Sequence, residues 1–409
     1  FSRTVDLSLQ AMQPAPYPPP STTDSTVTGT DMTNTNQEGT PVPQPAPITP
    51  LAENMREGLQ KSLRHLMRLR GERYDFSAYE IMIVTRKALQ IFETEPVLVP
   101  VKAPCSIVGD LDGQVSDLCN AFYVHATGDT RGFLNQRYVF LGNYVGKGGY
   151  SMECIFILFI LKILYPTEFI LLRGINETTK AGCVSGFYDE LMGRYEQKYA
   201  DLYFARFNKV FNAMPLCAIV AQKVLCVHAG ICPEMTSKEV INQIPKPLTD
   251  PSTNVIAHSL LLSDPMIGEP AHRTRDHGQG IHFGEPLFDG VCQRLGVALV
   301  VRGHQTPPCG FSFFGSRLVT VYGATSVTEE KMTMSALLTI AVDGKIGFKI
   351  CYPTKPGRGP GESSDDWRRA YEENSNDPFY EMNPEFMEKL NLGMLMPLKG
   401  KNQTKGKKK

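Results

Sequence analysis

The chain has 409 residues, with 42 lysines and arginines against 42 aspartates and glutamates, so its formal net charge is zero. This balance excludes a globally basic nucleic-acid-binding protein and a strongly acidic, solvating chain. The hydrophobic fraction of 42% and the charged fraction of 21% are ordinary for a globular protein. Ten cysteines are too sparse for a disulfide scaffold of this length. They favour reduced thiols and an intracellular location, cytoplasmic or nuclear.

The composition divides the chain into three parts. Residues 1–50 contain ten of the 30 prolines and ten threonines, and they are expected to be a disordered extension because they can bury little apolar surface. Residues 51–355 have globular composition. Residues 356–409 are acidic at first and carry six lysines in the last eleven positions, which predicts a flexible tail. We therefore expect one large domain between two extensions.

Apolar spacing in residues 51–355 predicts helices first and then strands that alternate with helices. Helical spacing is shared by Leu59, Leu63, Leu66 and Met67, and then by Ile81, Val84, Ala88 and Phe92. Strands are predicted at 105–108, 138–141, 169–172, 218–220, 224–228 and 298–301, helices at 151–165, at 187–214 and before Leu295, and hairpins up to Tyr352. This alternation indicates an α/β protein.

The longest apolar run is IFILFILKI at residues 155–163, which Lys162 interrupts. It is about half as long as a membrane-spanning helix must be. We expect a buried helix here and no membrane span.

Polar, glycine-flanked turns follow apolar strands five times. Their sequences are VGDLDGQ, LGNYVGKG, LRGINE, VHAG and VRGHQ. In α/β sheets, ligand sites form beyond the carboxyl ends of the strands, where such turns place side chains in a crevice. Carboxylate, amide and imidazole groups from five strand ends could coordinate two hard or borderline metal ions. One Gly-Asp turn says little, but the ordered set of five points to a metal site.

The set of turns resembles the phosphoprotein phosphatase family of serine/threonine phosphatases, most closely the protein phosphatase 1 catalytic subunit. The resemblance covers about Glu57 to Pro353 and includes the runs YVFLGNYV, FILLRG, GFYDE and LLLSDP. It implies an α/β, calcineurin-like metallophosphoesterase fold with a central β-sandwich flanked by helices. It also implies a dinuclear centre, of Mn or of Fe and Zn, whose bridging hydroxide attacks phosphorus while a histidine protonates the leaving oxygen.

The metal-ligand positions that this resemblance implies are partly substituted. They are occupied here by Asp110, Asp112, Asn143, His228 and His304, and Ile175 stands at one more. Asp112 replaces a histidine, and Asn143 replaces the carboxylate that bridges both ions. Without an anionic bridge, two cations repel each other with less compensation. We expect either no metal or a single ion held by Asp110, Asp112, His228 and His304. Each histidine is equally compatible with an ordinary hydrogen-bonded strand-end residue.

The catalytic positions implied by the resemblance are substituted as well. Asn176 stands at the general-acid position, Lys147 and His277 stand where phosphate-binding arginines belong, and Arg302 keeps its type but is also compatible with a fold-holding role. The loop at 323–327 has lost its active-site tyrosine. Loss of a general acid typically lowers a rate by about 10²- to 10⁴-fold. Lysine, as a point charge, lacks the forked phosphate contact of arginine.

The resemblance further implies a docking groove, away from the active site, that takes a short β-strand peptide of a regulatory subunit with Val and Phe anchors. The matching positions are Val224, Leu299, Phe313 and Phe348, which would also be apolar as ordinary core residues. Two functions stay open. One is a catalytically inactive or impaired pseudophosphatase that binds regulatory subunits or phosphoproteins, without a nucleic-acid partner. The other is an active metal-dependent phosphoserine/phosphothreonine phosphatase with an altered site.

Overall fold

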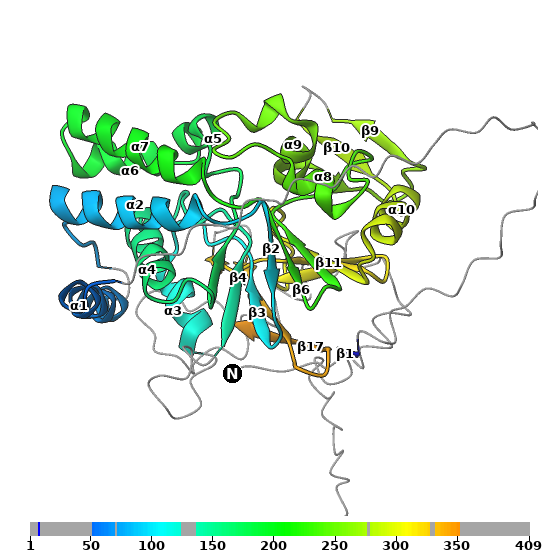
Figure 1. Ribbon diagram of the computed structural model, residues 1–409, viewed down its shortest axis with the longest axis horizontal. Helices are drawn as coiled ribbons and strands as arrows, with labels where there is room; N and C mark the ends of the chain where they lie inside the picture. Colours follow the sequence, from blue (N-terminus) through cyan, green and yellow to red (C-terminus); the bar gives the residue numbers. More distant parts are fainter. Residues whose placement is uncertain are drawn as a thin grey trace, which may run out of the picture.

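The computed structural model describes residues 7–8, 51–69, 72–123, 136–275, 279–327 and 332–351. In these residues two six-stranded sheets face each other, and helices flank them on both sides (Figure 1). The predicted α/β fold with a central β-sandwich is therefore confirmed. Apart from Leu7–Ser8, the predicted N-terminal extension at 1–50 lies outside the described residues, as does the predicted tail at 356–409.

The first sheet is mixed. In spatial order it contains β1 (Leu7–Ser8), β17 (Lys345–Cys351), β16 (Ser335–Ile340), β3 (Cys105–Val108), β4 (Arg137–Phe140) and β5 (Phe169–Leu171). Strands β3, β4 and β5 are parallel, whereas β16 and β17 form an antiparallel hairpin that joins β3. The short strand β1 pairs antiparallel with β17, and so the N-terminal segment supplies the edge of this sheet.

The second sheet is also mixed. In spatial order it contains β12 (Phe311–Phe314), β13 (Leu318–Val321), β11 (Leu299–Arg302), β7 (Val224–Val227), β6 (Cys217–Val220) and β2 (Leu98–Val101). Strands β7, β11 and β13 are parallel to one another. Smaller sheets join β8 (Asp264–Pro265), β10 (Ile281–Phe283) and β9 (His272–Thr274), and join β14 (Ser326–Val327) to β15 (Met332–Thr333).

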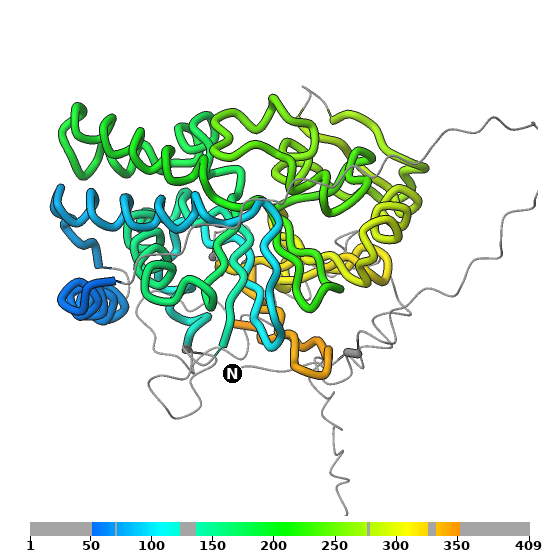
Figure 2. The backbone as a smooth tube through the Cα atoms, in the orientation of Figure 1, coloured from blue at the N-terminus to red at the C-terminus, as the bar shows by residue number. Residues whose placement is uncertain are grey.

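The helices form two outer layers. Beside the first sheet lie α1 (Glu53–Leu69), α2 (Ala78–Phe92), α3 (Val115–Tyr123), α4 (Ser151–Leu164), α6 (Phe187–Arg194) and α7 (Gln197–Phe211), with the short α5 (Thr179–Val184) leading into α6. Beside the second sheet lie α8 (Lys238–Asn242), α9 (Val255–Leu262) and α10 (Glu285–Leu295), with a 3-10 turn at Pro251–Thr253. Figure 2 shows that α2 and α7, far apart in the sequence, lie side by side.

Three large hydrophobic clusters fill the spaces between these layers. One lies between the two sheets and takes inward-facing side chains from both. The other two join the outer faces of the sheets to their helices. Burial on both faces explains why most strands are continuous apolar runs rather than alternating ones.

The predicted buried helix at 151–165 is α4, and each of its fourteen residues is buried. Lys162 forms an ion pair with Glu95, and its ammonium also donates to the carbonyls of Pro166 and Phe169. Burial lowers the pKa of Lys162, and Glu95 opposes this effect. Within the described ranges, no helix combines the length and the hydropathy that a membrane crossing requires.

Replacing Glu95 by alanine is expected to lower the free energy of unfolding by about 3–5 kcal/mol, because Lys162 then stays buried without a counter-charge. The double variant Glu95→Ala/Lys162→Met removes both charges and is expected to recover most of that loss. Urea unfolding measures both variants against Glu57→Ala, a glutamate change on the exposed face of α1. A single variant as stable as the parent chain would contradict the expectation.

The predicted helix at 187–214 is two helices, α6 and α7. The chain leaves α6 at Tyr195, whose backbone is extended with φ −133° and ψ 155°. Apolar spacing continues across the break, and so the sequence pattern did not reveal it. The other predicted elements end within one or two residues of the observed ones.

Candidate functional site

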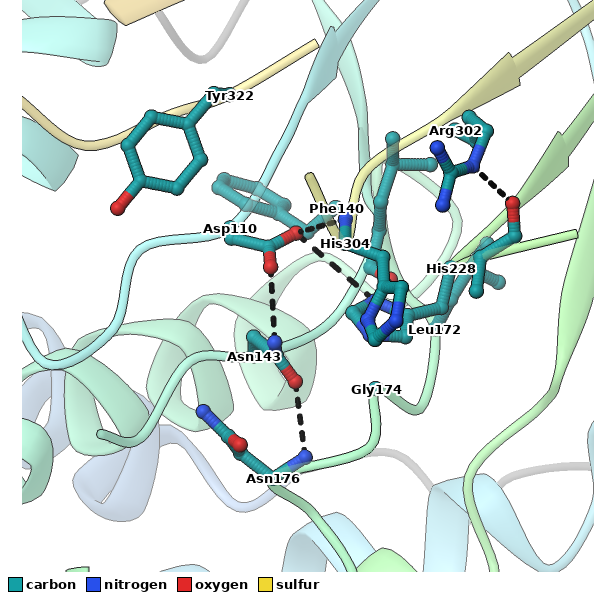
Figure 3. A network of polar contacts seen from close by, with 12 residues as sticks. Asp110, Phe140, Asn143, Leu172, Gly174, Asn176, His228, Arg302, His304 and Tyr322 are labelled. Carbon is teal, nitrogen blue, oxygen red and sulfur yellow. Dashed lines mark hydrogen bonds and ion pairs between the residues drawn. The ribbon is translucent and has the colours of Figure 1, made fainter. Parts of the chain in front are cut away.

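The five predicted turns meet at one end of the sandwich, beyond the carboxyl ends of β3, β4, β5, β7 and β11. Backbone contacts hold them together: the amide groups of Leu111 and Asp112 donate to the carbonyl of Asn143, and the amide of Gly303 donates to that of His228. Figure 3 shows the side chains that converge there. The arrangement follows from parallel strands that carry their turns to the same edge of each sheet.

Asp110 lies at the centre of this cluster and is buried. Its Oδ1 accepts the backbone N–H of His304 at 3.0 Å, and its Oδ2 accepts the side-chain amide of Asn143 at 2.8 Å. The Nδ1 of His228 lies 3.9 Å from Oδ1. Burial, and to a smaller extent the charge of Asp112, raises the pKa of Asp110 well above its ordinary value.

The side chain of Asn143 links Asp110 to the loop that follows β5 (Figure 3). Its Nδ2 donates to Asp110, while its Oδ1 accepts the backbone N–H of Asn176 at 2.9 Å. These two contacts define the orientation of the amide, since only the nitrogen end can donate. Both ends of the side chain are therefore used inside the protein.

Glu177 shapes the loop that carries Asn143. Its buried carboxylate accepts four backbone N–H groups, from Asn143 at 2.7 Å, Tyr144 at 2.8 Å, Val145 at 3.3 Å and Gly174 at 2.9 Å. Burial raises the pKa of Glu177 to about 7, and these hydrogen bonds oppose the shift. With its acceptors occupied by backbone groups, Glu177 holds the fold of the site.

Asp112 faces a different set of partners from Asp110. Its Oδ1 accepts Nδ2 of Asn176 at 3.2 Å, and its Oδ2 accepts the hydroxyl of Tyr322 at 3.1 Å. Burial raises the pKa of Asp112 to about 6, while the hydrogen bond from Tyr322 and, to a smaller extent, the charge of the exposed Lys147 oppose the shift. Asn176 also donates to the carbonyl of Val145 at 2.8 Å, which holds its amide against the loop.

Tyr322 is a site residue that the sequence reasoning missed. It lies one position before the 323–327 loop that was expected to have lost its tyrosine, and it forms an isolated β-bridge with Asp110. The available signal was an aromatic residue directly after β13, beside a predicted site loop. Its hydroxyl contact with Asp112 depends on a pairing across about two hundred residues, which local sequence patterns do not contain.

Three residues of the site adopt the left-handed backbone region. They are Asp112 (φ 47°), Asn143 (φ 52°) and His304 (φ 68°). Such conformations cost of the order of 1–3 kcal/mol each outside glycine and persist only where the surroundings impose them. Packing is close as well, because a side chain at Gly303 would collide with the carboxylate of Asp110.

The two histidines lie together, with ring centroids 5.2 Å apart in an edge-on arrangement. Nδ1 of His228 lies 3.0 Å from the carbonyl of Leu141 and donates to it, so its Nε2 carries a lone pair. That buried Nε2 has no hydrogen-bond partner among the described residues. Burial lowers the pKa of His228 strongly and that of His304 to about 3, which keeps both rings neutral.

Arg302 is buried and committed to internal partners. It donates to Asp264 at 2.6 Å, to Gln305 at 2.7 Å and to the carbonyl of Ala229. Its guanidinium therefore ties β11 to the neighbouring turns, the fold-holding role that the sequence left open.

Arg275, which the sequence reasoning missed, donates to the other oxygen of Asp264 at 2.5 Å. It lies two positions before His277, which is outside the described residues. The available signal was the presence of two arginines, Arg273 and Arg275, just before the position at which the resemblance implies a phosphate-binding arginine.

Comparison with known proteins supports the same architecture. Residues 105–308 match the family described as calcineurin-like phosphoesterase. The fold described above is that of the calcineurin-like metallophosphoesterases. A protein serine/threonine phosphatase from Saccharomyces cerevisiae, with similarity to human phosphatase PP5, is 20% identical over 75% of this chain and 98% of that chain, with a TM-score of 0.64. A cold-active protein-tyrosine phosphatase of a psychrophilic Shewanella species is 15% identical over 63% of this chain and 83% of that chain, with a TM-score of 0.44.

Calcineurin-like phosphoesterase domains bind a dinuclear metal centre, and the donor set of this domain does not fit one. Asn143 offers only a neutral amide oxygen, which already accepts the backbone N–H of Asn176, and each oxygen of Asp112 already accepts one hydrogen bond. Ile175 has no donor atom and packs against the cluster beside the second sheet. In the ranges that the structure describes, no group of three or more His, Cys, Asp and Glu side chains is arranged to hold a metal ion.

The four predicted docking residues of the phosphoesterase domain lie together in the cluster between the sheets. They come from four strands, namely Val224 from β7, Leu299 from β11, Phe313 from β12 and Phe348 from β17. All four are buried, and the ring of Phe348 stacks on Phe311 with centroids 4.3 Å apart. The groove thus stays a prediction, and its proposed walls belong to the sandwich core.

Asp117 lies in the first turn of α3 behind the site and is buried. It accepts the backbone N–H of Thr325 at 2.7 Å and its hydroxyl at 3.0 Å, while burial raises its pKa to about 6 from an ordinary 3.8. The folded state therefore binds this proton more tightly than the unfolded state. The stability that this carboxyl contributes is complete below pH 3.8 and is lost as the pH rises through about 6.

The variant Asp117→Asn is accordingly expected to lose less stability than the parent chain between pH 4 and pH 7, because asparagine does not ionise. Urea unfolding at both pH values measures the difference. Asp75→Asn, an exposed aspartate change, controls for the loss of one carboxylate and should leave the pH dependence unaltered. An Asp117→Asn profile that parallels the parent chain would show that Asp117 titrates normally.

Proposed function

We propose that this chain is a pseudophosphatase of the phosphoprotein phosphatase family, which acts by binding regulatory subunits or phosphoproteins rather than by hydrolysing phosphoesters. The observation that carries the proposal is the amide of Asn143. It spans Asp110 and the backbone of Asn176 with both ends in use, at the position where the resemblance implies a carboxylate between two ions. The amide N–H of Asn143 donates to Asp110, the carboxylate that the resemblance implies would bind a metal ion, and so Asp110 has a partner without an ion.

The catalytic positions support the same proposal. An amide has no titratable proton at neutral pH, and Asn176 directs its N–H groups at Asp112 and the carbonyl of Val145. The ammonium of Lys147 is a point charge without a forked donor pair, and the guanidinium of Arg302 is occupied by internal acceptors.

The second candidate is a weak metal-dependent serine/threonine phosphatase that uses one ion. The observation that favours it is Nε2 of His228, a neutral imidazole nitrogen of the kind that binds metals, which has no hydrogen-bond partner in the part of the chain that the structure describes. The ring of His304 lies beside that of His228 and is also neutral, and it would be the second ligand of the ion. When bound, an ion there would supply an activated water.

Titration of the 409-residue chain with Mn²⁺, followed by calorimetry, tests the proposal. We expect no stoichiometric binding, and the same heats from the His228→Asn variant. Two bound equivalents would overturn the proposal. One equivalent that disappears in His228→Asn would favour the single-ion candidate. His258→Asn is the matched control, since His258 lies on α9 and is part of no site contact described above.

A further inference from the structure

The edge of the first sheet is covered by a distant segment of the same chain. Leu7 pairs with Ile346 and Ser8 pairs with Lys345, so β1 extends the sheet beyond β17. Residues 9–50 separate this strand from the start of the domain. A sheet edge is a row of backbone donors and acceptors that readily accepts another strand. Here the occupant comes from the segment whose composition predicted disorder.

The direction of the β17 backbone groups shows which of them face this added strand. The carbonyl of Lys345 accepts the amide of Ala341, and that of Gly347 accepts the hydroxyl of Thr339, so both point toward β16. Backbone groups alternate along a strand. Those of Ile346 and Phe348 therefore point to the opposite side, where β1 lies.

The same edge borders the predicted docking positions. The side chains of Ile346 and Phe348 are buried in the cluster between the sheets, and Phe348 contacts Phe311 and Phe313 of β12. Strand β12 is the edge of the second sheet, so the edges of both sheets meet at this point. A peptide that adds to β17 would lie directly over apolar side chains from both sheets. Recognition by strand addition takes its affinity from backbone hydrogen bonds of this kind.

We propose that the N-terminal segment of this chain is a built-in strand that occupies the β17 edge and competes there with strand-forming peptides of a regulatory subunit. The competition rests on the proposed function, whereas the occupancy of the edge does not. A tethered strand has an effective concentration of the order of 1 mM. At that concentration, a tenfold weakening of a competing peptide corresponds to an intrinsic dissociation constant of about 0.1 mM for the tethered strand.

The first experiment measures amide exchange by nuclear magnetic resonance in the 409-residue chain and in its Leu7→Pro variant. Proline has no N–H and cannot complete the pair with Ile346. We expect faster exchange of the Ile346 amide in Leu7→Pro, with the Gly347 amide, which faces β16, unchanged. Thr33→Pro is the matched control, a proline introduced in the same extension away from β1. Unchanged exchange at Ile346, or protection that grows with protein concentration and so reflects a second copy, would overturn the proposal.

The second experiment adds a fluorescent peptide of residues 1–12 to the same three proteins and measures anisotropy. We expect binding to Leu7→Pro about tenfold tighter than to the parent chain or to Thr33→Pro. Equal binding to all three would overturn the competition. Neither readout depends on metal or turnover, so a failure here leaves the proposed function standing. Conversely, a chain that binds two equivalents of Mn²⁺ would refute the proposed function while leaving β1 in place.

Discussion

The 409-residue chain is expected to release phosphate from a phosphoserine peptide no faster than its Asp110→Ala variant, with or without Mn²⁺. The physical reason is the set of groups around Asp110. Asn176 cannot protonate a leaving alkoxide, and loss of a general acid alone typically lowers a rate by about 10²- to 10⁴-fold. Asn143 supplies a neutral amide whose two ends are engaged by Asp110 and by the backbone of Asn176. Both effects act on the same step and in the same direction.

The assay measures phosphate release together with the metal content of the same sample. Asp343→Ala, an exposed aspartate change on the turn between β16 and β17, is the matched control for the purification of variants. A Mn²⁺-dependent rate that vanishes in Asp110→Ala and persists in Asp343→Ala would contradict the expectation. It would establish an altered but working phosphatase.

The second large effect is expected from Glu177. Replacing it by alanine leaves four buried backbone N–H groups without their acceptor, and each such group costs about 1–3 kcal/mol. We expect the free energy of unfolding to fall by about 4 kcal/mol or more. Glu177→Gln keeps one oxygen and should lose roughly half as much, since its nitrogen end faces two donors.

Urea unfolding monitored by circular dichroism compares both variants with Glu57→Ala, whose side chain is exposed. The order of stability should be Glu57→Ala, then Glu177→Gln, then Glu177→Ala. If both Glu177 variants unfold like the control, the carboxylate does not hold the loop of Asn143. The left-handed backbone of Asn143 would then need another explanation.

Much of the fold was predictable because its elements carry strong local patterns. Strand β3 and helices α2 and α4 follow from apolar runs and helical spacing, and their observed bounds lie within a few residues of the prediction. Boundaries were less certain where the apolar pattern continues through a change in backbone direction, as at Tyr195 between α6 and α7.

The candidate site was predictable in its members but not in their contacts. The turns that hold Asp110, Asn143 and His228 were identified from their position after apolar strands. The contacts of Tyr322 with Asp112 and of Arg275 with Asp264 were not predicted from the sequence. Each joins two different segments of the chain, and local patterns do not show which segments meet. The acceptor to which a buried donor is bonded depends on the positions of the backbone segments, and the packing of both sheets determines those positions.

The sequence by itself determined the layered α/β architecture, the five turns and the identity of the groups they carry, since these depend on local composition and spacing. In particular, the sequence alone shows that position 175 has no metal-binding atom and that positions 143 and 176 carry neutral amides. Only the tertiary structure decided how those groups are used. It joined both ends of the Asn143 amide to neighbours, left Nε2 of His228 without a partner among the described residues, and paired Leu7 with Ile346. The contacts of Asn143 and the pairing of Leu7 join segments that the sequence separates widely, and the burial of His228 depends on the packing of the sheets, so these outcomes exist only in the folded chain.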